Sequence, residues 1–339
     1  MRYWALMLAL LAGPAAAQSS FSHNDWDVVC DNTHTCRAVG YHCEDCAGGT
    51  ADFSPQAVSV LLTRKAGPNT PFTAQLTVQN TATELSFTIN GGVLAELQLD
   101  DDLQATLPPP AASALVRALT GSTTIAFEHN GVFHRLSDSG STAALLFMDE
   151  YQGRVGAKDA AVRPGDRAAT KAKPAALAPL VTPVSWQPLS PEDQSAHAMA
   201  AGDIRQAVVR RMADQDCNRF EDALAQGAVE ITLYAINSSY VLATTPCWLA
   251  AYNGASAAFL VPVAAPDELD LISLNITDVV DETLITAMKS RGLGDCWSGS
   301  EMVWIGHGFA LQSEWTTGPQ CRGFAGGAWV LPHFVTRAK

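Results

Sequence analysis

Basic residues are scarce in this sequence. Its 339 residues include 21 Lys and Arg against 34 Asp and Glu, which gives a formal net charge of -13. Nucleic-acid phosphates and anionic membrane surfaces repel an acidic chain. We therefore expect neither nucleic acid nor a membrane surface as the partner of this protein.

Long apolar runs are also missing. No stretch reaches 18 uncharged apolar residues, whereas a membrane-spanning helix needs about 20. The apolar segment Tyr3–Ala12 is short, follows Arg2 and precedes Ala15-Ala16-Ala17, which is the pattern of a cleaved secretory signal. The sequence thus predicts a signal peptide over residues 1–17, cleavage near Ala17, and a periplasmic or secreted protein without a membrane span.

Recognisable catalytic and cofactor motifs are absent. The sequence contains no G-x-S-x-G elbow, no H-E-x-x-H, no Walker loop and no G-x-G-x-x-G, and its eight His are scattered. We therefore predict no cofactor and favour a non-catalytic, binding or inhibitor-like protein of the cell envelope. The alternative is a periplasmic hydrolase whose site the sequence does not reveal.

Cysteine, by contrast, is well represented. An even number of eight cysteines behind an export signal favours disulfides, and they fall into two sets of four, within residues 30–46 and within residues 217–321. Spacing alone does not choose among the three pairings that each set allows. We predict the pairs Cys30 with Cys36, Cys43 with Cys46, Cys217 with Cys247, and Cys296 with Cys321, with Cys30 to Cys46 as an alternative.

A zinc site is an alternative use of the first cysteines. His42, Cys43 and Cys46, with Cys30, Cys36 and His34 nearby, offer enough ligands at short spacing for tetrahedral zinc, which needs four Cys or His. Exported cysteines oxidise, however, and zinc ribbons carry two C-x-x-C pairs where this segment has one. We therefore predict disulfides and no metal.

The chain divides into two halves around a segment of different composition. Residues 151–185 contain nine Ala and four Pro, and six basic residues against two acidic ones. Proline breaks helices and favours extended conformations, so this range predicts a basic linker exposed to solvent. It separates a disulfide-stapled β domain over residues 18–150 from a second domain over residues 186–339, and we expect proteolysis in the linker to release two folded halves.

The predicted fold class is mainly β with some α. The first domain is expected to be a β-sandwich or barrel-like, with strands over 26–30, 58–63, 73–78, 85–89, 94–99 and 123–127, and helices over 111–119 and 141–151. The second domain is expected to be antiparallel α+β. It opens with a helix capped at Ser190 and continues with strands over 231–237, 240–245, 257–263, 271–276, 302–305, 309–312 and 328–330.

Several motifs resemble a known family. The runs GLGDCW at 292–297, EMVWIGHGFAL at 301–311 and CRG at 321–323 resemble the carboxyl-terminal signature of the secreted bacterial domain-of-unknown-function 1176 family, with further matches at WDVVCDN (26–32) and EYQGRVG (150–156). The first domain is also similar, more weakly, to the invasion-associated locus B family. The resemblance implies export and a shared fold, and it leaves the activity open. Relatives usually carry glycine where this chain has Trp297 and Trp248.

These motifs also suggest where a partner would bind. If Cys296 pairs with Cys321, their neighbours Asp295, Trp297 and Arg322 lie close together at one end of the second domain. An indole beside a carboxylate and a guanidinium is a plausible contact for a partner. We predict Asp295, Trp297 and Arg322 as a contact patch for an envelope protein or a glycan, and we expect Asp295 and Arg322 to form an ion pair.

Overall fold

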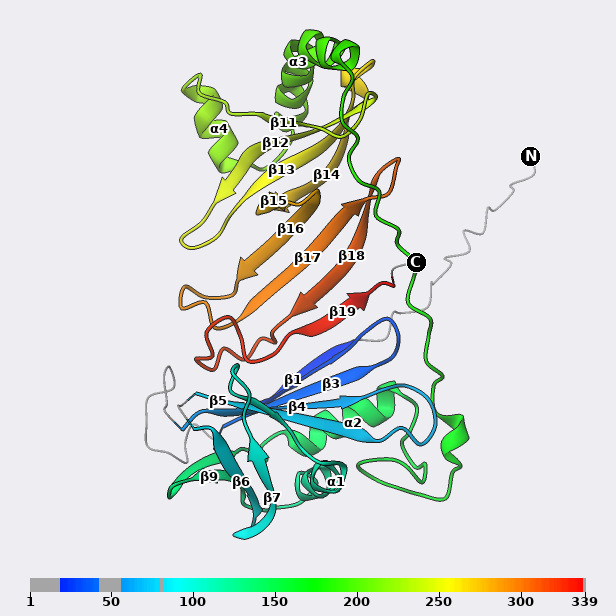
Figure 1. The fold of residues 1–339 in the computed structure, drawn as a ribbon, viewed down its shortest axis with the longest axis vertical. Helices are drawn as coiled ribbons and strands as arrows, with labels where there is room; N and C mark the ends of the chain where they lie inside the picture. Colours follow the sequence, from blue (N-terminus) through cyan, green and yellow to red (C-terminus); the bar gives the residue numbers. More distant parts are fainter. Residues whose placement is uncertain (1–18, 43–55, 80–81, 338–339) are drawn as a thin grey trace, which may run out of the picture.

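The computed structural model describes residues 19–42, 56–79 and 82–337. The predicted signal peptide and the predicted pair Cys43–Cys46 lie outside this range. Figure 1 shows an elongated molecule, with the first half of the chain at one end, two sheets of the second half stacked above it, and α3 and α4 at the far end.

The first half contains two antiparallel sheets and two helices. The first sheet has the order β1-β2-β3-β4-β5-β8 and the second has the order β10-β9-β6-β7. The elements are β1 (Ser20–His23), β2 (Trp26–Cys30), β3 (Cys36–Tyr41), β4 (Val58–Arg64), β5 (Phe72–Val78), β6 (Glu84–Ile89), β7 (Gly92–Gln98), β8 (Gln104–Thr106), α1 (Pro109–Ala118), β9 (Ile125–His129), β10 (Val132–Leu136) and α2 (Ser141–Tyr151).

One apolar core joins these elements. It takes residues from both sheets and both helices, among them Trp26, Leu62, Phe87, Leu115 and Leu145. The indole of Trp26 lies against Gly40 of the neighbouring strand, where an added Cβ would come within 2.3 Å of the ring. Only glycine at position 40 allows this ring to lie on the strand.

The second half contains two further antiparallel sheets, β11-β12-β13-β14 and β15-β16-β17-β18-β19. The helix α3 begins where it was predicted, because the hydroxyl of Ser190 accepts a hydrogen bond from the Asp193 N–H at 3.1 Å. The elements are α3 (Pro191–Met212), α4 (Asn218–Ala225), β11 (Thr232–Ala235), β12 (Tyr240–Leu249), β13 (Gly254–Pro262), β14 (Asp270–Ile276), β15 (Asp278–Val280), β16 (Thr283–Lys289), β17 (Trp297–Trp304), β18 (Phe309–Thr316) and β19 (Leu331–Val335), with short 3-10 turns at Ala169–Lys171 and Pro266–Glu268.

The mainly β prediction with some α is confirmed. The described residues form four open antiparallel sheets and no closed barrel. The predicted strand at 328–330 is wrong, because β19 begins at Leu331. Trp329 instead lies at the contact between the halves, where its indole N–H donates a hydrogen bond to the hydroxyl of Ser59 at 3.0 Å.

Three of the predicted disulfides are present in the structure: Cys30–Cys36, Cys217–Cys247 and Cys296–Cys321. Cys30 and Cys36 are register partners on β2 and β3, so the bridge closes the connection between neighbouring strands. The alternative pairing of Cys30 with Cys46 is therefore wrong.

The two halves share an apolar core. Val39, Tyr41 and Leu61 of the first half pack with Trp329 and Leu331 of the second, and all five are buried. Burial of apolar surface across the contact stabilises the association of the halves. Cleavage of the segment between the halves would leave this contact intact.

Residues 151–185 are anchored at both ends rather than exposed throughout. The side chain of Arg154 is completely buried in the first half and donates to the carbonyl of Gly67 at 2.6 Å. Farther along, the N–H of Val184 donates to the carbonyl of Trp304 in β17 at 2.8 Å. Figure 1 shows the intervening chain running along one side of the molecule from the first half to α3. Within the described residues, no helix is long and apolar enough to cross a membrane.

Candidate functional site

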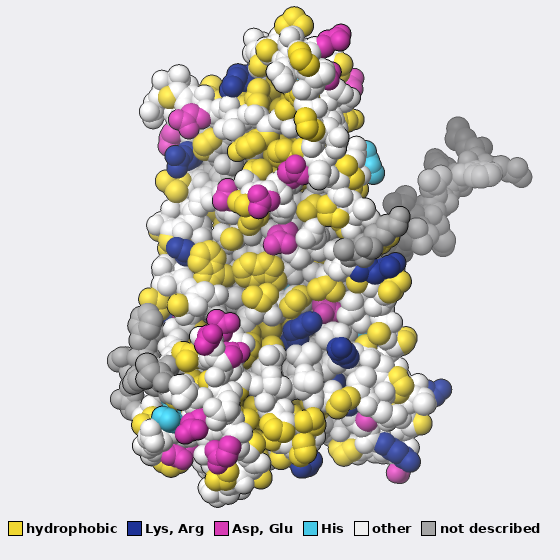
Figure 2. Space-filling model, viewed as in Figure 1, with side chains coloured by type: hydrophobic (Ala, Val, Ile, Leu, Met, Phe, Trp, Pro, Cys, Tyr) yellow, Lys and Arg dark blue, Asp and Glu magenta, His cyan; other side chains and the backbone are white. Residues whose placement is uncertain are grey.

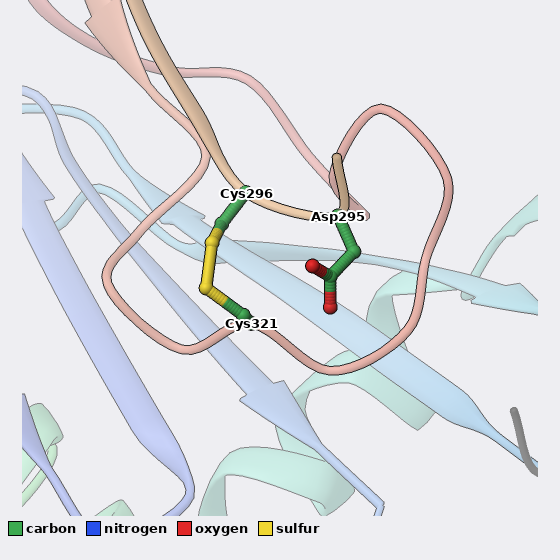
Figure 3. A group of neighbouring side chains, drawn as sticks. All are labelled: Asp295, Cys296 and Cys321. Atoms are coloured by element: carbon green, nitrogen blue, oxygen red, sulfur yellow. A yellow bond between two sulfur atoms is a disulfide. The ribbon is translucent and has the colours of Figure 1, made fainter. Parts of the chain in front are cut away.

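The Cys296–Cys321 bridge lies where the two halves meet. It links the chain just before β17 to the loop between β18 and β19, and Figure 3 shows Asp295 beside it, above the strands of the first half. Ligand atoms of Asp295, Cys296 and Cys321 lie within 4.8 Å of one another. Metal binding needs the thiolate form of cysteine, and both sulfurs here are in a disulfide. This group is therefore part of the covalent framework and not a metal site.

Asp295 is buried and holds the local backbone. Its carboxylate accepts hydrogen bonds from the Arg291 side chain at 2.5 and 2.8 Å and from the Gly323 N–H at 2.7 Å. Burial raises the pKa of Asp295, but the hydrogen bonds from Arg291 and Gly323 outweigh it and leave the pKa below its ordinary value. Asp295 thus ties the loop that carries Cys321 to the start of β17.

Arg322 reaches into the first half of the chain. Its guanidinium donates to the Asp25 carboxylate at 2.6 Å and lies 5.8 Å from the centre of the Tyr41 ring. The predicted ion pair between Asp295 and Arg322 is therefore wrong. Asp295 forms its ion pair with Arg291, and Arg322 forms its ion pair with Asp25. Arg322 is a contact between the halves and is only 8% exposed.

Asp27 completes a polar group that we call the junction cluster, namely Asp27, Tyr41, Asp295 and Arg322. Asp27 is completely buried, and its carboxylate accepts the Gln320 N–H at 3.1 Å. Burial raises the pKa of Asp27 to about 6, despite the opposing effects of Ser22, Gln320 and Arg322. Burial, together with Asp27, likewise raises the pKa of Tyr41. This cluster was not predicted from the sequence, since Asp27 lies within an otherwise apolar strand.

Trp297 differs from Asp295 and Arg322 because it lies at the surface. Its ring is half-buried, its indole N–H donates to the Gly294 carbonyl at 2.8 Å, and the Lys289 ammonium is 5.3 Å from the ring centre. Of the three predicted contact residues, only Trp297 is thus positioned to touch a partner.

Trp297 belongs to a larger surface that we call the aromatic face: Ala287, Lys289, Trp297, Gly299, Glu301, Ser313, Trp315 and Pro332. Strand pairing places Ala287, Gly299, Trp315 and Pro332 opposite one another across β16, β17, β18 and β19. Lys289 pairs with Trp297, two residues before Gly299, and Glu301 pairs with Ser313, two residues after it. Because side chains alternate along a strand, all these residues share one side of the sheet.

The indole of Trp315 lies across the middle of this face. A Cβ added at Gly299 would come within 2.6 Å of the Trp315 ring, so the indole lies directly on the backbone of β17. Trp315 is half-buried, as are Glu301 and Ser313 beside it. Figure 2 shows hydrophobic side chains gathered in the middle of the viewed face, over the region that β16, β17 and β18 occupy in Figure 1.

Removal of the indole at position 297 should have a small effect on stability. We expect Trp297→Ala to lower the free energy of unfolding by about 1 kcal/mol, because a half-buried ring contributes far less than a core aromatic. Urea unfolding followed by circular dichroism measures this. A loss above about 3 kcal/mol, the scale for deleting a core aromatic, would show that Trp297 is part of the core.

The Cys296–Cys321 disulfide should contribute more to stability than the Trp297 indole does. Replacing Cys296 and Cys321 together with serine is expected to lower stability by about 2–5 kcal/mol, the usual range for native disulfides in secreted domains. Thermal unfolding under non-reducing conditions tests this. An unchanged melting temperature would contradict it.

Comparisons with known proteins place the chain in a sequence family. The family described as "Protein of unknown function (DUF1176)" matches residues 20–336. The chain is similar to the "Uncharacterized protein YpfG" of Escherichia coli (strain K12), with 25% identity over 96% of this chain and 95% of that protein. No solved structure matches the chain.

Proposed function

The chain belongs to the DUF1176 family, and from this premise and the surfaces described above we propose that it is a non-catalytic binding protein of the bacterial cell envelope. The aromatic face carries this proposal. Tryptophan provides a large, rigid apolar surface with one polar N–H, and it is enriched where proteins bind partners. Here two indoles lie on the same side of one sheet.

Location in the envelope is supported by two separate features. Residues 1–17 have the charge and apolar pattern of a cleaved export signal. Three disulfides, one of them bridging the loops at the junction, fit an oxidising compartment such as the periplasm. The junction cluster fits a structural role in holding the halves together, because its Arg322 pairs with Asp25 and its Asp27 accepts the Gln320 N–H.

Capture from an envelope extract tests the proposal. Immobilised protein should retain one component at fixed stoichiometry, and Trp315→Ala should lose it. A matched control is Phe133→Ala, which removes an aromatic ring that is 49% exposed on β10 in the other half of the molecule. This variant should retain the component.

The same preparation distinguishes binding from hydrolysis. Purified protein should leave peptidoglycan and peptide substrates intact over many hours. Turnover that persists in a repurified sample would overturn the non-catalytic proposal and favour a periplasmic hydrolase.

A further inference from the structure

We propose that the ligand of the aromatic face is an extended glycan of β-linked pyranose rings, an inference that rests on the proposed binding function. The hydrogen atoms on the flat side of a pyranose ring form an apolar surface that carries slight positive charge. The face of an indole is electron-rich, so the two surfaces attract each other when they stack.

The position of Trp315 suits such stacking. Its indole rests on Gly299, and the register partners of Gly299 and Trp315 on the outer strands, Ala287 and Pro332, are small or compact. One side of the ring is therefore held against the sheet, while the other points away from it. Trp315 is half-buried, so part of its ring is accessible and a sugar ring can stack on that part.

A second indole extends the stacking surface of the aromatic face along the strands. Trp297 lies two residues before Gly299, diagonally across from Trp315. Diagonal neighbours of this kind are about 7–8 Å apart on a sheet surface. An extended chain lying along this diagonal stacks on Trp315 and reaches Trp297 together with the Lys289 ammonium that lies over its ring, whereas a single sugar contacts only one of the two indoles.

Polar groups border the platform on both sides. The Lys289 ammonium lies over the Trp297 ring, 5.3 Å from its centre, and Glu301 lies two residues beyond Gly299, where its carboxylate accepts a hydrogen bond from Ser313 at 3.1 Å. A carboxylate retains further acceptor positions after one such bond, and an ammonium carries three donors. These groups match sugar hydroxyls, which both donate and accept hydrogen bonds.

The shape of the face selects among glycans. The aromatic face is a sheet surface, and the floor across its middle row consists of one indole with Ala, Gly and Pro. Chains of β-1,4-linked rings with equatorial substituents are flat ribbons that expose successive ring faces, whereas α-1,4-linked chains coil. The platform therefore fits the β-linked ribbon.

Titration with defined hexasaccharides tests this inference. Chitohexaose and cellohexaose are the β-1,4-linked probes and maltohexaose is the α-1,4-linked comparison, with tryptophan fluorescence and calorimetry as readouts. We expect at least one β-linked probe to bind and maltohexaose to bind at least about tenfold more weakly. Trp315→Ala should weaken binding by about tenfold or more, the effect of losing one good stacking contact.

Further variants separate stacking from folding. Trp315→Tyr keeps an aromatic ring and should restore most of the affinity, and Glu301→Gln should weaken binding while leaving the circular dichroism spectrum unchanged. Phe133→Ala serves as the control and should bind like the unmodified protein. Equal binding of α-linked and β-linked probes, or an affinity that Trp315→Ala leaves unchanged, would overturn the inference.

Failure of the glycan inference can be told apart from failure of the binding function. If neither β-linked probe binds but Trp315→Ala abolishes capture of an envelope protein, the glycan inference is wrong and the binding function stands. If Trp315→Ala changes neither result, both proposals fail.

Discussion

Replacing Asp149 with alanine should lower the free energy of unfolding by about 3–5 kcal/mol. Asp149 pairs with Arg64 at 3.1 Å, and both side chains are at most 4% exposed. Its second oxygen accepts the N–H of Val162 at 2.9 Å, within the segment predicted as a linker. Removing one partner of a buried ion pair leaves the other charge buried without compensation, which is strongly destabilising.

The charges around the Arg64–Asp149 pair explain why the expected loss of stability is large. Arg154 is completely buried nearby, and burial together with Arg154 lowers the pKa of Arg64 to about 10. Two guanidiniums share this interior with the carboxylates of Asp149 and Asp159. Loss of Asp149 leaves two buried positive charges facing a single carboxylate.

Urea unfolding measures this effect against a matched control. Asp267→Ala removes the same side chain from an exposed pair, since Asp267 and its partner Arg210 are 79% and 58% exposed. Exposed pairs contribute at most about 1 kcal/mol, so the control should change stability little. Similar losses in the two variants would contradict the structural role of the buried network.

The second large effect is a pH dependence that originates at Asp27. Burial raises the folded-state pKa of Asp27 to about 6 from 3.8, so the folded state binds this proton more tightly than the unfolded state. The contribution of Asp27 to stability is therefore fully present below pH 3.8 and is lost as the pH rises through about 6. It amounts to about 2 kcal/mol at pH 4.5 and about 3 kcal/mol at lower pH.

Comparison with Asp27→Asn isolates this group. The charged groups around Asp27 include Arg322, which also contacts Tyr41. The difference in unfolding free energy between the two proteins removes most of their shared pH dependence. Between pH 7.5 and 4.5 the wild type should gain about 2 kcal/mol relative to Asp27→Asn. A constant difference across this range would contradict the raised pKa.

Local patterns predicted much of the fold. A short run of apolar and β-branched residues located β2 at Trp26–Cys30, and the cap at Ser190 located the start of α3, because both signals depend on neighbouring residues. The strand β3 was not predicted, since Gly40 and Arg37 interrupt its apolar pattern. Gly40 is needed because Trp26 lies against it.

Contacts between distant segments could not be predicted in the same way. Arg154 lies in a stretch rich in Ala, Pro and Lys, where a basic residue is expected to be exposed. The Gly67 carbonyl and the Thr70 hydroxyl, from the distant connection between β4 and β5, accept its hydrogen bonds and create a buried site for it. Trp315 gained its place on the aromatic face only through its strand register with Gly299. The turn between β17 and β18 sets the register as far as Met302, and the bulge that follows shifts it, so the sequence identified Trp297 alone.

Footprinting by hydroxyl-radical oxidation and mass spectrometry tests the aromatic face as the binding surface most directly. The protein is oxidised with and without the component captured from the envelope extract, and the modification of each tryptophan is compared. We predict that Trp297 and Trp315 become protected while Trp248, which is half-buried on β12, keeps its modification rate. Protection confined to other residues, with Trp297 and Trp315 equally oxidised in both samples, would contradict the assignment of this face.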